Sequence, residues 1–88
     1  MLTSKQRAYL RSLANTLEPV LHVGKDGVGE NLIAQADGVL EKRELIKGAV
    51  LENSLLSARE AAEAIAAATR SEVVQVIGAK FVLFRIQQ

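Results

Sequence analysis

The most distinctive chemistry in the chain belongs to the segment 24–29, which reads Gly-Lys-Asp-Gly-Val-Gly. Glycine permits positive φ and lets another backbone approach closely, because it has no Cβ. A helix is expected directly after the segment, and the unpaired amide groups at a helix N-terminus favour anions such as phosphate. Lys25 adds a flexible ammonium group. The segment can therefore bind phosphate, although Gly24, Asp26 and Gly27 taken alone are more simply explained as a structural turn.

Residues that could support catalysis or bind a metal are few. The glycine segment matches neither the GxxxxGK[ST] nor the GxGxxG pattern, so a nucleotide-binding enzyme is not indicated. Ser54, Ser57 and Ser71 have no neighbouring histidine to activate them as nucleophiles. His22 is the only histidine and there is no cysteine, so a metal site lacks its usual ligands. We expect no enzyme, no cofactor and no metal. We interpret His22 as structural, with stacking on a base as the alternative.

Basic side chains near the N-terminus form a second candidate for anion binding. Lys5, Arg7 and Arg11 precede the glycine segment, and the two arginines lie four residues apart, on one side of a helix. They are placed either to meet phosphates or to form an ordinary solvated face. Arg85 flanks the last expected strand, where it has either an RNA or acidic partner or a solubility role at a sheet edge.

Helices and strands are expected to alternate and to position these residues. Apolar residues recur at i, i+3, i+4 and i+7 from Leu10 to Leu17, as on one helical face, and Pro19 ends that helix. The Thr3–Gln6 and Ser57–Glu60 pairs have the spacing of capping boxes. The expected elements are helices over residues 4–17, 29–42 and from Ser57 to about Thr69, and strands over residues 20–23, 44–51, 73–77 and 80–86.

The order α-β-α-β-α-β-β predicts an α/β fold with a mixed sheet on which the helices pack. Gly78 and Ala79 suit a two-residue turn that would pair the last two strands antiparallel. We expect residues 1–88 to form one compact domain, since 88 residues is a single-domain length.

Composition and charge exclude some classes of protein. The formal net charge of +1 does not by itself favour nucleic acid, so any such partner must be argued from where the charges lie. No apolar run is long enough to span a membrane. The polar beginning of the chain lacks the apolar core of a secretory signal. We therefore expect a cytoplasmic protein without a membrane or small-molecule partner, and a monomer as the simplest state.

Five short segments, in their order and spacing, resemble the bacterial YhbY-like proteins, the single-domain form of the chloroplast RNA splicing and ribosome maturation (CRM) domain. The segments are residues 2–7 (LTSKQR), 23–27 (VGKDG), 44–47 (ELIK), 74–78 (VQVIG) and 82–85 (VLFR). Together they are much more specific than any one of them. The similarity extends from Leu2 to about Ile86.

The resemblance implies a fold like the C-terminal domain of translation initiation factor three, with a KH-like GxxG loop. In KH domains this loop binds the backbone of single-stranded RNA. Gly24, Lys25 and Gly27 match the RNA-binding loop, and Asp26 fills a variable position. Family members are associated with precursors of the large ribosomal subunit and their assembly. The resemblance therefore implies ribosomal RNA as the partner.

The sequence departs from the family pattern at three places. Phe84 stands where tyrosine is usual, and Gly48 stands where a hydrophobic residue is usual. Many members continue with a basic tail after the last strand, whereas this sequence reads Gln87-Gln88 there. Without such a tail we expect weaker RNA binding.

The sequence thus predicts an RNA-binding protein that contacts ribosomal RNA during large-subunit assembly. The residues expected to contact RNA are Gly24, Lys25, Asp26, Gly27, Lys5, Arg7, Arg11 and Arg85. The alternative is a protein-interaction adaptor that does not bind nucleic acid. RNA binding would weaken steeply with salt, because bound counterions are released from the phosphates. Adaptor binding would be indifferent to charge reversal at Lys25.

Overall fold

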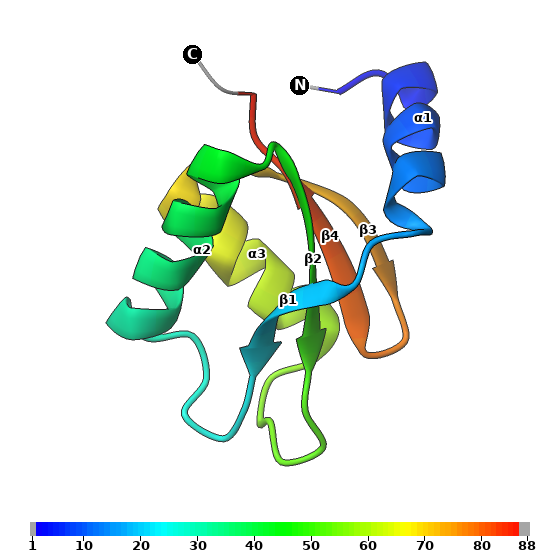
Figure 1. Ribbon diagram of the computed structural model, residues 1–88. Helices are drawn as coiled ribbons and strands as arrows, with labels where there is room; N and C mark the ends of the chain where they lie inside the picture. Colours follow the sequence, from blue (N-terminus) through cyan, green and yellow to red (C-terminus); the bar gives the residue numbers. More distant parts are fainter. Residues whose placement is uncertain (1, 87–88) are drawn as a thin grey trace.

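Helices and strands alternate along residues 2–86, the part of the chain that the computed structural model describes (Figure 1). The elements are α1 (Ser4–Ala14), β1 (Pro19–Val23), α2 (Glu30–Lys42), β2 (Leu45–Val50), α3 (Ala58–Thr69), β3 (Glu72–Ile77) and β4 (Lys80–Phe84). This order confirms the α-β-α-β-α-β-β prediction. The expectation about a tail concerns Gln87 and Gln88, which lie outside the described residues.

Both predicted capping boxes are present. The hydroxyl oxygen of Thr3 accepts from the amide of Gln6 at the start of α1, and Ser57 does the same for Glu60 at the start of α3. In each case the side chain three residues on accepts from the amide of the capping residue. A capping box satisfies two amides that the first turn of a helix leaves unpaired. These local bonds explain why both helices begin where the sequence predicts.

Several elements end earlier than predicted. Helix α1 ends at Ala14 rather than at residue 17, and the chain then turns with the Leu17 amide donating to the Ala14 carbonyl at 3.0 Å. Pro19 starts β1, a position where its missing amide removes no ladder bond that the strand needs. Strand β4 ends at Phe84, two residues before the predicted end. The Arg85 amide still donates to the Glu44 carbonyl at 2.9 Å, just beyond the end of the strand.

The sheet is mixed, as predicted, with the strand order β1-β2-β4-β3. Strand β1 pairs parallel to β2, while β4 pairs antiparallel to both β2 and β3. Ile77 pairs with Lys80 across the predicted two-residue turn, and Gly78 has a φ of 56°. A positive φ at the first central position is what such a turn requires of glycine. The order leaves β1 and β3 as the edge strands.

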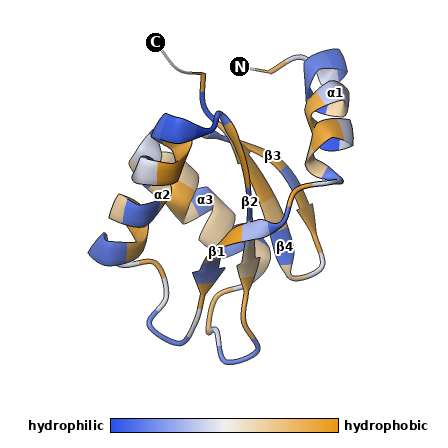
Figure 2. Ribbon diagram, in the orientation of Figure 1, coloured by the Kyte–Doolittle hydropathy of each residue, from blue (hydrophilic) through white to orange (hydrophobic). Residues whose placement is uncertain are grey.

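Each face of the sheet carries its own core. Phe81 and Leu83 of β4 face α2 and α3, where they pack with Leu21, Leu40 and Ile65. The intervening β4 residue Val82 faces α1 and packs with Leu10, Ala14 and Val74. This alternation follows from the two-residue period of a strand. Helix α1 therefore lies on the opposite side of the sheet from α2 and α3 (Figures 1 and 2).

Gly48 in the centre of the sheet is explained by its cross-strand neighbour. Gly48 pairs with Phe81, and a Cβ at Gly48 would lie 2.3 Å from the Cζ atom of the Phe81 ring. Phe81 is only 1% exposed, so the ring has no room to move away. A phenylalanine ring that covers a glycine on the next strand replaces the packing that the missing side chain would supply. The departure from the family pattern at Gly48 is thus matched by Phe81.

No helix within residues 2–86 is long and apolar enough to cross a membrane.

Candidate functional site

The glycine loop, defined here as residues 24–29, connects β1 to α2. Its first four residues form a tight turn, in which the Gly27 amide donates to the Gly24 carbonyl at 3.1 Å. Gly27 has a φ of 70°, in the left-handed region that glycine occupies without strain. Lys25 and Asp26 are at the tip and are exposed. The turn therefore presents a short stretch of backbone at the surface, bordered by Leu51, Asn53 and Leu56.

Helix α2 begins directly behind this turn and, unlike α1 and α3, has no capping side chain. Its N-cap residue is Gly29, which has no side chain that could accept a hydrogen bond from the first amides. The first helical bond runs from the Ile33 amide to the Gly29 carbonyl, at 3.0 Å. The earlier amides of the first turn have no partner within the helix, and they carry the positive end of its dipole. Backbone groups that favour an anion are thus placed beside the glycine loop.

A groove of about 520 Å³ lies beside the glycine loop. Its lining residues come from the edge strand β1, the loop and the first two turns of α2: His22, Gly24, Lys25, Asp26, Gly27, Gly29, Glu30, Asn31, Leu32 and Gln35. Polar groups of several kinds therefore surround one groove that ends at the glycine turn. This collection suits a ligand with both charged and polar parts.

Side-chain charge alone does not favour an anion in this groove. Lys25 supplies one positive charge, whereas Asp26 and Glu30 supply two negative charges, Glu30 from the first turn of α2. Anion binding would therefore depend on the α2 amides and on close approach over the glycines, with Lys25 as the one cationic side chain. A site of this kind holds a phosphate by geometry more than by net charge.

His22, which the sequence led us to interpret as structural, is exposed and lines this groove. The reason is the strand period: Leu21 and Val23 are fully buried beneath α2 and α3, and His22 between them points the other way. Sequence reasoning also missed Asn31 and Gln35 as groove residues. Their spacing of four, one helical turn, on the helix that follows the glycine segment was the available signal.

The basic residues of α1 do not join the glycine loop. Figure 1 shows α1 and the loop at opposite corners of the molecule, with the sheet between them. Lys5 and Arg11 are exposed on α1. Arg7 is half-buried, and its guanidinium donates to the carbonyl oxygens of Val73 and Val74, the second at 3.2 Å.

Those two carbonyl groups lie where β3 is irregular, since the register of its pairing with β4 shifts between Val73 and Gln75. A bulge leaves backbone groups without a ladder partner. Arg7 supplies that partner and ties α1 to the edge strand. Arg7 thus stabilises the packing of α1 against β3.

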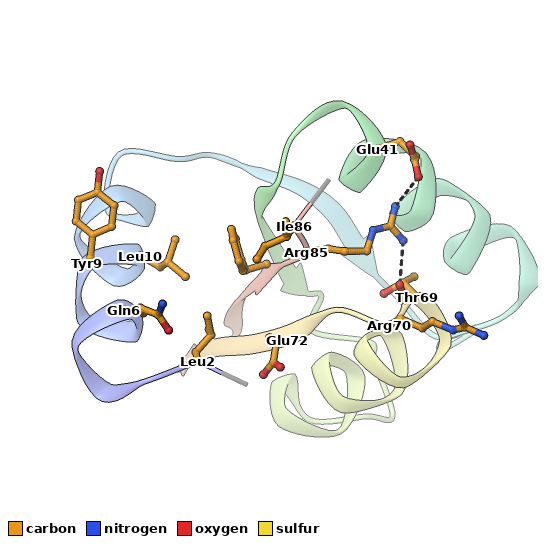
Figure 3. A pocket seen from close by; sticks show the side chains of 11 residues that line it. Leu2, Gln6, Tyr9, Leu10, Glu41, Thr69, Arg70, Glu72, Arg85 and Ile86 are labelled. Atoms are coloured by element: carbon orange, nitrogen blue, oxygen red, sulfur yellow. Dashed lines mark hydrogen bonds and ion pairs between the residues drawn. The ribbon is translucent and has the colours of Figure 1, made fainter. Parts of the chain in front are cut away.

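Arg85 is also occupied by internal contacts, away from the glycine loop. Its guanidinium donates to the Asp37 carboxylate at 2.7 Å. It also donates to the Thr69 carbonyl at 2.9 Å and lies 3.3 Å from the Glu41 carboxylate (Figure 3). The Arg85 side chain is only 17% exposed. It joins the end of β4 to α2 and to the end of α3. The sequence signal for this role was the spacing of four between Asp37 and Glu41 on one helical face.

A larger pocket, of about 860 Å³, lies near Arg85 at the end of the sheet (Figure 3). Helix α1 contributes Tyr9 and Leu10, and the opposite side is formed by Glu72, Ile86 and the Arg85 stem. Tyr9 is 64% exposed and Ile86 is 68% exposed. This pocket is more apolar than the groove and lies on a different part of the molecule.

Residues 2–86 contain no group of three or more histidine, aspartate or glutamate side chains placed to hold a metal ion.

Comparisons with known proteins show the family and the fold of this chain. The sequence model of the CRS1 / YhbY (CRM) domain matches residues 2–85. The Bacillus subtilis protein named "Probable RNA-binding protein YqeI" is 47% identical over 85 residues, which are 97% of this chain and 88% of that protein.

A Methanocaldococcus jannaschii protein whose name carries the same RNA-binding description is 44% identical over 86 residues, 96% of this chain and 63% of its own length. The solution structure of hypothetical protein SAV1595 from Staphylococcus aureus superposes with a TM-score of 0.84 at 51% identity, over 100% of this chain and 92% of that one.

Proposed function

The chain belongs to the CRS1/YhbY (CRM) domain family, and from that premise we propose that it binds RNA through the glycine loop and the groove beside it. The proposal rests on one observation: the uncapped N-terminus of α2 opens onto the tight turn from Gly24 to Gly27. The RNA-binding names of its relatives from Bacillus subtilis and Methanocaldococcus jannaschii support the same partner.

The groove residues divide in this proposal into those that hold phosphate and those that contact a sugar or base. The α2 amides and Lys25 hold a phosphate, while Gly24 and Gly27 let the RNA backbone come close to the protein backbone. Asp26 occupies the turn without contributing to phosphate binding. His22 and Gln35 are placed further along the groove, where they can contact a sugar or the edge of a base.

The other basic residues divide into two groups. Lys5 and Arg11 are exposed, so we keep them as a separate contact for a longer RNA that reaches around the sheet to α1. Arg7 and Arg85 donate to partners inside the protein, and we assign both to stabilising the fold.

As the finer form of this proposal, the RNA is ribosomal RNA in a precursor of the large subunit. The support is the family resemblance of the glycine loop and its flanking segments. Co-sedimentation with ribosomal particles on a sucrose gradient, followed by crosslinking and sequencing of the bound RNA, tests it. Reads that map outside large-subunit RNA would contradict it.

We expect the protein to bind RNA without catalysing a reaction. We also expect it to be a single-domain monomer in the cytoplasm. The three serines considered as nucleophiles make local hydrogen bonds: Ser54 with Leu56, Ser57 with Glu60, and Ser71 with Thr69. Capping and turn formation account for all three hydroxyl groups. The proposal therefore assigns no reaction to the groove.

The second candidate function is a protein-interaction adaptor, and the pocket at the end of the sheet favours it. Tyr9 and Ile86 expose apolar surface around that pocket, which is the kind of surface that protein partners cover. The near-neutral net charge also suits an adaptor.

Fluorescence anisotropy with labelled RNA and matched duplex DNA, at two salt concentrations, separates the two functions. We expect RNA binding that weakens with salt, and we expect Lys25→Asp to abolish most of it, since the variant replaces the one cation of the groove with an anion. The matched control is Lys42→Asp, which makes the same charge change at the other end of α2, about 18 Å along the helix. Equal losses in both variants would reject the glycine loop as the RNA-binding site. No RNA binding by folded protein at low salt would reject the RNA proposal in favour of the adaptor.

A further inference from the structure

We infer that the loop between β2 and α3, residues 51–57, binds an unpaired nucleobase next to the RNA backbone on the glycine loop, so that the protein prefers single-stranded to duplex RNA. The inference rests on the proposed function and adds to it the form of RNA that is bound. It also assigns a role to residues that lie between the five segments on which the family resemblance rests.

The 51–57 loop and the glycine loop lie side by side at the same end of the molecule (Figure 1). The Leu51 amide donates to the Val23 carbonyl at 2.8 Å. A Cβ at Gly24 would lie 3.6 Å from both Leu51 Cδ1 and Asn53 Oδ1. A nucleotide whose phosphate lies over Gly24 is therefore within reach of these two side chains.

Hydrogen bonds hold the 51–57 loop in a fixed shape. The Ser54 amide donates to the Leu51 carbonyl at 3.0 Å. The Ser54 hydroxyl also accepts from the Leu56 amide and donates to the Leu56 carbonyl, at 3.1 and 2.9 Å. Leu56 itself packs against the core beneath α3. Leu55 is therefore held outward by ordered neighbours, and it is 88% exposed.

The side chains of this loop suit a base better than a phosphate. Leu55 and Leu51 are 88% and 46% exposed, and a flat base face that covers them removes apolar surface from water. The side-chain amide of Asn53 offers both a donor and an acceptor to the edge of a base. Glu52 lies between Leu51 and Asn53 and is exposed, so its charge repels phosphate from this loop.

Only unpaired RNA can supply such a base. In an A-form duplex the base faces are stacked, and the accessible wide groove presents hydroxyl groups and base edges. A single strand can place its phosphate on the glycine loop and turn one base onto Leu55. The two loops together then bind one nucleotide by its backbone and its base.

The test compares three RNA probes by fluorescence anisotropy: a single strand, a blunt duplex containing the same sequence, and a single strand of the same length with an abasic residue at every position. We expect wild-type protein to prefer the complete single strand. We expect Leu55→Ala to weaken binding to it roughly three- to tenfold, and to leave binding to the other two probes unchanged. Leu13→Ala is the matched control, because Leu13 is also exposed, at 44%, but lies on α1.

The possible results separate the inference from the proposed function. If wild-type protein binds no probe, or if Lys25→Asp has no effect, the proposed function itself fails. If Lys25→Asp abolishes binding but Leu55→Ala weakens all three probes equally or none of them, only the inference about the 51–57 loop is overturned. A preference for the duplex would also overturn it.

Discussion

At the scale of single residues, two glycines of the glycine loop have different roles. The fold favours glycine at position 27, because a φ of 70° strains a residue with a Cβ. Gly24 has no such requirement, since a Cβ there would meet its nearest neighbours at 3.6 Å, an ordinary contact distance. If the proposed function is right, Gly24 is needed for the ligand. The two positions can therefore be separated by experiment.

We expect Gly27→Ala to lower the free energy of unfolding by about 1–2 kcal/mol, the cost of a left-handed alanine. We expect Gly24→Ala to change stability by less than about 0.5 kcal/mol, as for an unstrained surface substitution, and to weaken RNA binding because a methyl group then separates the two backbones. Urea denaturation and RNA titration of the same samples measure both quantities. A Gly24→Ala protein that binds RNA as wild type does would show that close approach at Gly24 is not used.

At the scale of elements, capping hydrogen bonds between near neighbours determine where helices begin. Contacts between paired strands determine which residue fits at a given strand position. The capping boxes at Thr3 and Ser57 use residues three apart in sequence, and both were predictable. Gly48 and Phe81, which pair across β2 and β4, are 33 positions apart in the sequence, and no local pattern predicts that they meet. Sequence reasoning therefore described Gly48 only as a departure from a family pattern.

We expect Gly48→Ala to lower the free energy of unfolding by about 1–3 kcal/mol, because the new methyl group overlaps the buried Phe81 ring. Adding Phe81→Leu should recover part of that loss, since the smaller side chain makes room for the methyl group. A double-mutant cycle by thermal or urea denaturation then gives a coupling of about 0.5–3 kcal/mol. Simple additivity of the two substitutions would show that the ring does not constrain residue 48.

At the scale of the whole molecule, the sheet separates groups that lie close in sequence and joins groups that lie far apart. Helix α1 precedes the glycine loop in the chain, yet it packs on the other face of the sheet. Arg85 follows the last strand, yet it bonds to α2 and α3 at once. The position of a charge along the chain was therefore a poor guide to the surface on which it acts.

We expect Arg85→Gln to lower the free energy of unfolding by about 1.5–3 kcal/mol, because the variant loses hydrogen bonds made by a charged group. RNA affinity of the folded protein should be unchanged. Arg59→Gln is the control: its partner Glu63 is 3.9 Å away and both side chains are mostly exposed, so the change should cost less than about 1 kcal/mol. Weaker RNA binding by fully folded Arg85→Gln protein would return Arg85 to the RNA-binding surface.

The sequence by itself determined the element order, the mixed α/β class, the two capping boxes, the Gly78-Ala79 turn and the family. All of these follow from contacts between near neighbours, from the two- and 3.6-residue periods, or from motif order. Only the tertiary structure decided the strand order, the side of the sheet on which α1 packs, the internal partners of Arg7 and Arg85, and the exposure of His22 in a groove with Gln35. These depend on which distant segments meet, and that is decided when the two faces of the sheet bury their apolar side chains against different helices.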